Sequence, residues 1–155
     1  MSGQVEARLQ ELGIEVPEAA APVANYLGYV VTGNLCFTAG QVTLKDGGFV
    51  YQGKLGAEIS VDDGYQAARL CAINIIAQLK AACGGDLDRV KRIVKLVGFV
   101  NSTPDFTDQP KVINGASDLM VEVFGEAGKH ARSAVSAGSL PISVAVEVEC
   151  VAEIA

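Results

Sequence analysis

The sequence is short of charge: it carries 19% charged residues, one histidine and no tryptophan in 155 residues, while half of the residues are apolar. Its mean hydropathy is +0.31. A monomer of this composition would expose large apolar patches, so we expect a subunit interface to cover them. The net charge is −6. This acidity argues against nucleic acid as the main partner, because phosphate binding needs clustered Lys and Arg.

The sequence also lacks the motifs of metal, redox and membrane proteins. No two cysteines form a CxxC pair, so neither a zinc site nor a redox motif is expected. Residues 1–13 are charged and unlike a signal peptide, and no apolar run is long enough to span a membrane. We therefore expect a cytoplasmic protein without a membrane partner or a metal. Buried free thiols are predicted for the four cysteines, which lie in apolar runs or beside glycine: Cys36, Cys71, Cys83 and Cys150.

The N-terminal third predicts a short helix, an extended arm and short strands. A helix over residues 2–12 would be capped by Ser2, and two prolines keep the following segment extended. Turn signals then separate three short strands, expected at residues 26–31, 35–39 and 49–51.

Two long helices follow. The first is predicted over residues 61–82, with Ser60 in a capping box and an apolar face at helical spacing. The second is predicted over residues 110–126, where Pro110 is tolerated in the first turn. Gly115 in its interior costs roughly 1 kcal/mol relative to Ala.

The strand predicted at residues 91–100 has two apolar faces, which is typical of a central strand. Simple alternation places Ile93 with Val97 and Phe99 on one face and Val94, Leu96 and Val100 on the other. Two more strands, joined by the segment GSLPIS, close the chain. The order of elements predicts an α+β fold in which a mixed sheet has two main helices on one face. The other face is left for another subunit. We expect one domain, 1–155, in which residues 1–24 form the helix and arm and residues 25–155 the core.

Two ionisable residues, Arg132 and Glu147, lie among small or apolar neighbours in the closing strands. A charge in such surroundings needs an ion-pair partner or a ligand. The residues alone leave both possibilities open, including a structural ion pair of Arg132 with Glu147 or Glu149. The single histidine, His130, is either a general base near Arg132 or a partly exposed residue at the entrance of the strand.

Seven short motifs then occur in the order in which one known family carries them. They are Asn25-Tyr26, residues 33–41, Asp105-Phe106, Asn114, Ala131-Arg132-Ser133, Leu140-Pro141 and the alternating Val-Glu run at 146–149. On these residues the chain resembles the RidA family, also called YjgF or endoribonuclease L-PSP, in a longer subgroup. The resemblance implies a chorismate-mutase-like fold and a homotrimer with clefts between neighbouring subunits. It further implies hydrolysis of reactive 2-imino or enamino acids to 2-keto acids and ammonia, without a cofactor or a metal.

The same resemblance gives Arg132 and Glu147 catalytic roles. Arg132 would bind the substrate carboxylate through two parallel hydrogen bonds, and Glu147 would orient or deprotonate the attacking water. Tyr26 and Asn114 would line the substrate site. For these two, packing beside Tyr29 in a strand and support of a helix turn are the structural alternatives.

Two further positions, Ala39 and Ala134, match the expected substrate site but depart from the family pattern. The family often has Ser at the first and Cys at the second. Loss of the hydroxyl removes a hydrogen bond to the ligand, whereas the backbone carbonyl of Ala134 can still hold a water. A non-catalytic trimer that binds a small carboxylate is therefore the alternative function. An endoribonuclease is disfavoured by the acidic composition and the single histidine.

Overall fold

The computed structural model describes residues 3–155, whose centre is a five-stranded sheet in the order β1-β2-β7-β5-β6. Strand β5 pairs in parallel with β6 and antiparallel with β7, and the remaining pairs are antiparallel. The predicted mixed sheet of an α+β fold is thereby confirmed. The strands are β1 (Tyr29–Thr32), β2 (Leu35–Thr38), β5 (Val90–Asn101), β6 (Ala131–Ala137) and β7 (Val146–Ile154).

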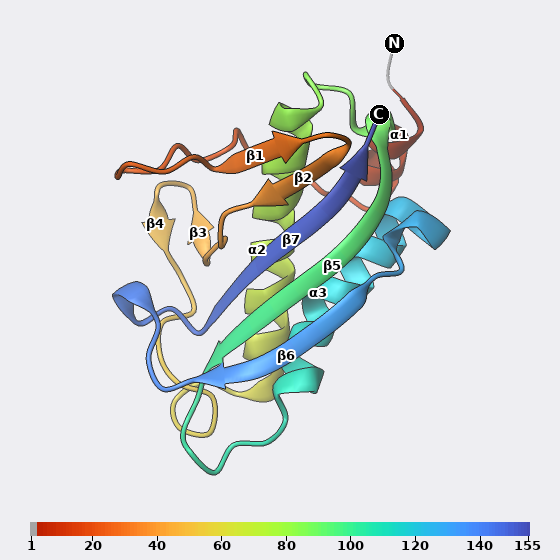
Figure 1. Cartoon of the computed structure of the whole chain (residues 1–155). Helices are drawn as coiled ribbons and strands as arrows, with labels where there is room; N and C mark the ends of the chain where they lie inside the picture. The colour runs from red at the N-terminus through yellow and green to blue at the C-terminus, as the bar shows by residue number, and fades with distance from the viewer. Residues whose placement is uncertain (1–2) are drawn as a thin grey trace.

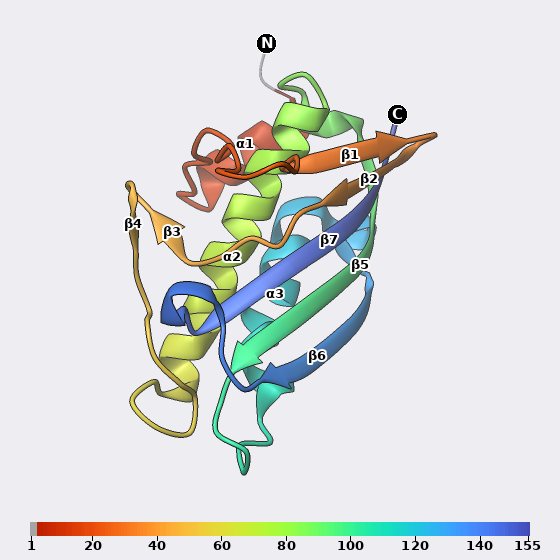
Figure 2. The same cartoon turned by 60° about the vertical axis from the view of Figure 1, so that its left-hand side comes forward.

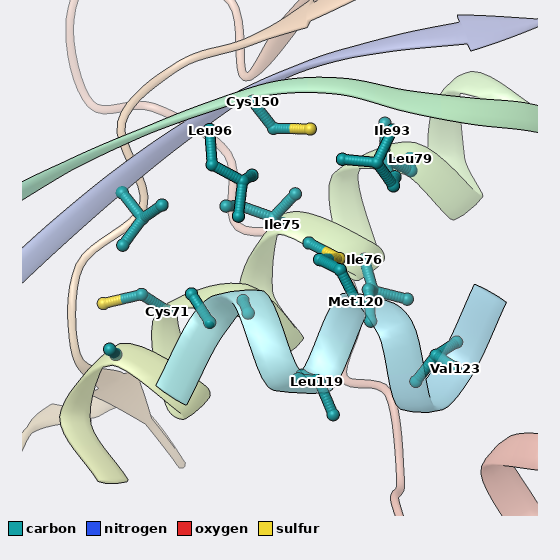
Figure 3. Packing of buried hydrophobic residues seen from close by; sticks show 14 of the residues in the cluster. Cys71, Ile75, Ile76, Leu79, Ile93, Leu96, Leu119, Met120, Val123 and Cys150 are labelled. Carbon is teal, nitrogen blue, oxygen red and sulfur yellow. The ribbon is translucent and has the colours of Figure 1, made fainter. Parts of the chain in front are cut away.

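Helices α2 (Val61–Ala82) and α3 (Gln109–Phe124) lie together on one face of this sheet, as Figures 1 and 2 show. The predicted cap of α2 is confirmed, because Ser60 accepts a hydrogen bond from the Asp63 backbone N–H at 3.1 Å. The core fills the space between the helices and the sheet (Figure 3). Its largest fully buried side chains include Ile75, Ile76 and Leu79 of α2, Ile93 and Leu96 of β5, and Leu119 and Met120 of α3.

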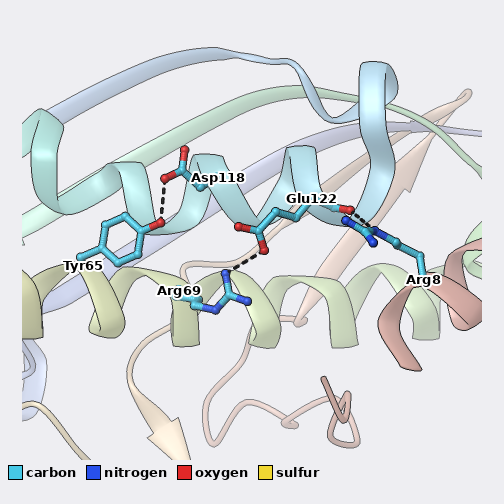
Figure 4. A network of polar contacts seen from close by, with 5 residues as sticks. All are labelled: Arg8, Tyr65, Arg69, Asp118 and Glu122. Carbon is cyan, nitrogen blue, oxygen red and sulfur yellow. Dashed lines mark hydrogen bonds and ion pairs between the residues drawn. The ribbon is translucent and has the colours of Figure 1, made fainter. Parts of the chain in front are cut away.

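Polar contacts join the helices on their outer side (Figure 4). Tyr65 donates its hydroxyl to Asp118 at 2.7 Å, and Arg69 forms an ion pair with Glu122 at 3.2 Å. Arg8 of α1 (Gln4–Glu11) reaches the backbone carbonyl of Glu122 at 2.8 Å. These partly exposed contacts fix the side of α3 that faces away from the sheet.

The N-terminus of α1 is capped from a distant part of the chain. Both the Gln4 and the Val5 backbone N–H donate to the Asp88 carboxylate at 2.9 Å, and these bonds hold the pKa of Asp88 below its ordinary value. The cap predicted at Ser2 lies outside the described residues. Four short elements complete the chain: the hairpin β3 (Leu44–Lys45) and β4 (Gly48–Phe49), and the 3-10 turns η1 (Leu87–Arg89), η2 (Gly125–Gly128) and η3 (Pro141–Ser143).

Two strand predictions ran too long. Tyr26 does not lie in a strand, because its backbone N–H bonds the Ala24 carbonyl in a tight bend and β1 begins only at Tyr29. Its side chain is 58% exposed, so the proposed packing beside Tyr29 in a strand was wrong. Strand β4 ends at Phe49, and Tyr51 adopts a left-handed conformation with φ of 52°.

The faces predicted for β5 were wrong at its beginning. Register shifts between Val90 and Arg92, and between Ile93 and Lys95, interrupt the alternation. Because of these bulges, Ile93 and Leu96 are both fully buried against the helices, whereas Val94 is 38% exposed. Sequence period alone cannot reveal such a shift.

The second face of the sheet is open: no helix of residues 3–155 lies over it in Figure 1. Cross-strand pairs put Val30, Phe37 and Val151 side by side on this face, and Val135, Phe99 and Glu147 in a second row. Val30, Phe37 and Val135 are 52%, 42% and 44% exposed. None of the helices in residues 3–155 is long and apolar enough to cross a membrane.

The close crossing of α2 and α3 at Gly115 gives a first prediction. A Cβ at this position would collide with the backbone carbonyl of Tyr65. The clash forces the helices apart, and overpacking of this kind costs about 1–3 kcal/mol. This exceeds the helix propensity of roughly 1 kcal/mol that Ala would add. The obstacle is a backbone atom that cannot rotate away, so the cost lies in the upper part of this range. After the gain in propensity is subtracted, Gly115→Ala should lower the free energy of unfolding by about 1–2 kcal/mol in urea denaturation at fixed protein concentration.

Gly138→Ala is the matched control, because a Cβ there meets no atom within 4 Å. It should change the free energy of unfolding by less than about 0.5 kcal/mol. A Gly115→Ala protein as stable as the wild type would contradict a crossing this close.

Candidate functional site

Arg132 leaves the edge strand β6 on the helix side of the sheet. Its backbone pairs with Leu96, which in turn pairs with Cys150, and both of these are buried under the helices. The side chain reaches α3, where Nη1 donates to Asn114 Oδ1 at 2.8 Å and to Ser117 Oγ at 3.2 Å. The structure therefore brings together two predicted site residues, Arg132 and Asn114.

The structural ion pair of Arg132 with Glu147 or Glu149 does not form. Glu147 pairs with Phe99 in the row that faces the open side of the sheet, opposite to the face that carries Arg132. Glu149 alternates with buried neighbours and shares the face of Glu147. The ion pairs of residues 3–155 do not include Arg132. This alternative was wrong because alternation along β7 sends both carboxylates away from the arginine.

The guanidinium of Arg132 thus meets neutral partners only, within the described part of the chain. Both hydrogen bonds use Nη1, and no described residue accepts from Nε or Nη2. These two nitrogens present parallel N–H groups, a geometry that matches the two oxygens of a carboxylate. The side chain is half-buried, so its charge is accessible from one side.

His130 lies at the entrance of β6, as predicted, and both of its ring nitrogens are engaged. Nδ1 lies 2.7 Å from the Gly128 carbonyl oxygen, and Nε2 lies 2.8 Å from Ser117 Oγ. A carbonyl only accepts, so Nδ1 carries the proton and Nε2 accepts the Ser117 hydroxyl. A free general base is therefore not available at this histidine in the observed arrangement.

Ser117 is the contact of Arg132 that sequence reasoning missed. It was considered only as one position on the apolar face of α3. Its spacing from Asn114, three residues along a helix, places both side chains on the same side. This pair of polar residues on an otherwise apolar helix was the signal in the sequence for a polar contact with β6.

Glu147 is half-buried on β7, and its carboxylate occupies the space that a side chain at Gly40 would need. Burial raises its pKa above the ordinary value, and the neighbouring Glu149 raises it further. None of the hydrogen bonds within residues 3–155 reaches this carboxylate. A carboxylate with a raised pKa and no fixed partner is suited to accept a proton from water.

Ala39 adjoins Glu147 through Gly40, at the side of the sheet formed by β1 and β2. Its N–H donates to the Gly28 carbonyl at 2.8 Å, and its own carbonyl accepts from Gln41 Nε2 at 3.1 Å. Tyr26 lies in the bend before β1, the outermost strand on this side.

Ala134 lies at the opposite margin, on β6 with Arg132. It pairs with Gly98 and packs partly against the core, so only its backbone is available for a ligand. The six predicted residues therefore form two groups. Arg132, Asn114 and Ala134 lie at the β6 margin, while Tyr26, Ala39 and Glu147 lie on the β1, β2 and β7 side. One chain does not unite the two groups.

The remaining chemistry-bearing groups lie elsewhere. Residues 3–155 contain no group of three His, Cys, Asp or Glu side chains that could hold a metal ion. The predicted buried free thiols are confirmed for all four cysteines. Burial raises the pKa of Cys36 to about 11 and also raises the pKa of the other three thiols, so they are poor nucleophiles at neutral pH.

Comparison with known proteins adds a family to this geometry. Residues 6–154 match the model of the family described as "YjgF/chorismate_mutase-like, putative endoribonuclease". Protein TCP17 of Trypanosoma cruzi is 52% identical over 154 residues, which is 99% of this chain and 96% of that protein. The RutC family protein slr0709 of Synechocystis is 29% identical over 90% of this chain and 93% of its own length.

Solved structures share the fold. A crystal structure of protein Atu1372 from Agrobacterium tumefaciens, described as of unknown function, superposes with a TM-score of 0.92 and 45% identity. It covers 97% of this chain and 92% of that one. The E. coli protein TdcF, solved with bound serine, superposes with a TM-score of 0.64 at 25% identity, over 89% of this chain and 94% of its own. The fold is thus shared with proteins of different descriptions.

Glu147 gives a prediction about pH. Its folded-state pKa lies above the ordinary value of 4.5, so folding favours the protonated form. The associated stability is fully present below the ordinary pKa and is lost as pH rises through the raised pKa. Glu147→Gln stays neutral at every pH. Its free energy of unfolding, relative to wild type, should therefore increase between about pH 4 and about pH 7 in urea titrations.

Asp88→Asn is a control of opposite sign. The folded-state pKa of Asp88 is lowered by the backbone bonds from α1, so the wild type gains stability relative to this variant as pH rises. A flat or falling difference for Glu147→Gln, together with the expected trend for Asp88→Asn, would contradict the raised pKa of Glu147.

Proposed function

Because the chain belongs to the YjgF/chorismate mutase-like family, we propose that it hydrolyses reactive 2-imino acids, or their enamine tautomers, to 2-keto acids and ammonia. The observation that carries this proposal is the guanidinium of Arg132. It is held through Nη1 by two neutral acceptors and presents Nε and Nη2 for a carboxylate. A 2-imino acid carries its carboxylate next to the carbon that water must attack, so one anchor orients the reacting bond.

The site is formed in a cleft between subunits of a homotrimer. Two features support this: Arg132 lies at the β6 margin on the helix side whereas Glu147 lies on the central strand β7 and faces the open side, and that open face exposes apolar side chains such as Phe37 and Val135. A second copy that covers this face can place the Glu147 side of one chain beside the Arg132 margin of its neighbour.

In the reaction, Arg132 binds the carboxylate and Glu147 accepts a proton from water as its oxygen bonds to the C=N carbon. Glu147 passes this proton to the imine nitrogen, which gives a neutral carbinolamine. The hydroxyl proton of the carbinolamine then moves to the nitrogen, the C–N bond breaks, and ammonia and the 2-keto acid are released. Asn114 acts through Arg132, since its amide oxygen accepts from Nη1. The Ala134 backbone holds the water. Most of the rate enhancement comes from positioning.

A second candidate, a trimer that binds a small carboxylate without turnover, is favoured by one observation. Neither Ala39 nor Ala134 offers a polar side chain. The site therefore keeps the carboxylate anchor Arg132 but has few polar side chains that could take part in a reaction. The serine bound to the E. coli relative TdcF also fits a binding role. An endoribonuclease is not favoured, because both nitrogens of the single histidine are engaged in hydrogen bonds.

Arg132→Lys tests the anchor. Lysine keeps the charge but not the planar pair of N–H groups, and each charge-assisted hydrogen bond contributes about 1.5–3 kcal/mol. We expect kcat/KM for 2-iminobutanoate generated in situ to fall at least about 100-fold, measured as ammonia release. Arg132→Ala should abolish the activity. Arg69→Ala, which removes an arginine on the outer side of the helices, is the control and should keep wild-type kinetics.

No acceleration over buffer by the wild-type protein, with imines derived from serine or threonine, would reject the deaminase. Binding of 2-oxobutanoate without turnover would then support the carboxylate-binding alternative.

A shared cleft predicts complementation between inactive chains. Arg132→Ala and Glu147→Ala should each be inactive alone. In a trimer that mixes both variants, a cleft that joins the intact Arg132 of one chain with the intact Glu147 of its neighbour is complete. In an equal random mixture about one quarter of the clefts are complete, so the mixture should recover about one quarter of wild-type activity. Hybrids made by co-expression that stay inactive would show that the two residues do not act across an interface.

A further inference from the structure

Arg132 is connected to the backbone of η2 through two side chains. Its Nη1 donates to Ser117 Oγ at 3.2 Å, Ser117 lies 2.8 Å from His130 Nε2, and His130 Nδ1 lies 2.7 Å from the Gly128 carbonyl. These contacts link α3 and η2 with the first residues of β6. They involve no carboxylate, so their strength depends on geometry.

For a neutral imidazole, this network has one consistent proton arrangement. The Gly128 carbonyl accepts from His130 Nδ1–H, which leaves the Nε2 lone pair to accept the Ser117 hydroxyl. The Ser117 oxygen then has a lone pair for Arg132 Nη1–H. If Nε2 carried the proton instead, the Ser117 hydroxyl would lose its acceptor, and the Gly128 carbonyl would face a lone pair. Of the two neutral tautomers, the observed contacts therefore fit the one protonated at Nδ1.

The far end of the network is fixed in place. Gly128 is buried, and a Cβ there would collide with the backbone carbonyl of Met120 in α3. Ser117 belongs to the same helix. Both Ser117 and the Gly128 carbonyl are thus parts of one packed unit, and the imidazole bridges them. The hydroxyl that meets Arg132 cannot rotate freely.

We propose that Ser117 and His130 are positioning residues that fix Nη1 of Arg132 and so turn its Nε and Nη2 edge toward the ligand carboxylate. The orientation toward a ligand carboxylate rests on the proposed function, whereas the fixed position of the guanidinium rests on the contacts alone. Asn114 holds the same Nη1 from a second direction, so loss of the Ser117 network loosens the anchor without releasing it.

Ser117→Ala should raise KM for 2-iminobutanoate about tenfold and change kcat less than about twofold. The carboxylate is bound in the ground state and in the transition state alike, so a misaligned anchor affects KM first. A purely structural defect would instead lower the active fraction, and hence kcat, at unchanged KM. Ser117→Thr keeps a hydroxyl and should restore most of the affinity. His130→Phe, which removes the acceptor of that hydroxyl, should resemble Ser117→Ala.

Tyr65→Phe is the matched control. It deletes another hydroxyl that bonds an α3 residue, Asp118, next to Ser117 in sequence but on the outer side of the helix (Figure 4). Its KM should equal that of the wild type. A KM raised equally by Tyr65→Phe would show that α3 stability, not the Ser117 network, determines affinity.

Three measurements do not need turnover. Because His130 is the single histidine, its 15N spectrum reports the tautomer directly; Nδ1 should be protonated, and Ser117→Ala should shift the Nε2 resonance. The Arg132 side-chain resonances, identified by their absence in Arg132→Lys, should broaden in Ser117→Ala through rotation of the guanidinium. Titration with 2-oxobutanoate should give a dissociation constant about tenfold weaker for Ser117→Ala than for the wild type.

The outcomes separate the two proposals. If the wild type neither hydrolyses 2-iminobutanoate nor binds 2-oxobutanoate, the proposed function fails, and the guanidinium spectra still decide whether Ser117 and His130 hold Arg132. An imidazole protonated at Nε2, or Arg132 resonances unchanged by Ser117→Ala, would overturn the positioning role. Equal affinity of Ser117→Ala and wild type for 2-oxobutanoate would overturn its link to the ligand.

Discussion

The parallel pairing of β6 with β5 is the constraint on which the candidate site depends. Its register sets Arg132 beside the buried Leu96, and so directs the guanidinium toward α3 rather than toward the open face of the sheet. A shift by one residue would move Arg132 to the open face, away from Asn114 and Ser117. The buried row that includes Leu96 and Cys150 makes that shift costly, because it would expose apolar side chains.

The same alternation explains why Arg132 and Glu147 lie on opposite faces of the sheet in one chain. Along β7 the buried residues face α2 and α3, so Glu147 must face outward, while Arg132 two strands away faces inward. The apolar side chains around Glu147 raise its pKa, and Gly40 leaves room for its carboxylate. A carboxylate already partly removed from water loses less hydration when a second chain covers it.

Most of the architecture follows from patterns that are local in sequence. The capping box at Ser60 and the helical spacing after it predicted α2 with the bounds that the structure has, and the alternation of β7 separated its two faces. Two features were not predictable because they depend on contacts between distant segments. The bulges of β5 move Ile93 to the helix side, and the bend at Tyr26 is followed by Gly28, whose backbone lies against the side chain of Gln78.

For the site, sequence identified the charged residues but not their neighbours. Motif resemblance singled out Arg132, whereas its hydrogen bonds to α3 require the register of β6 and the position of α3 together. In the sequence, Ser117 is marked only by its spacing of three residues from Asn114, and serine in a helix is common. Its role arises because His130 and Arg132, two residues apart on an extended strand, point to the same side and reach one hydroxyl. A neutral network of this kind orients a cation without neutralising it, which a carboxylate in place of Ser117 would do.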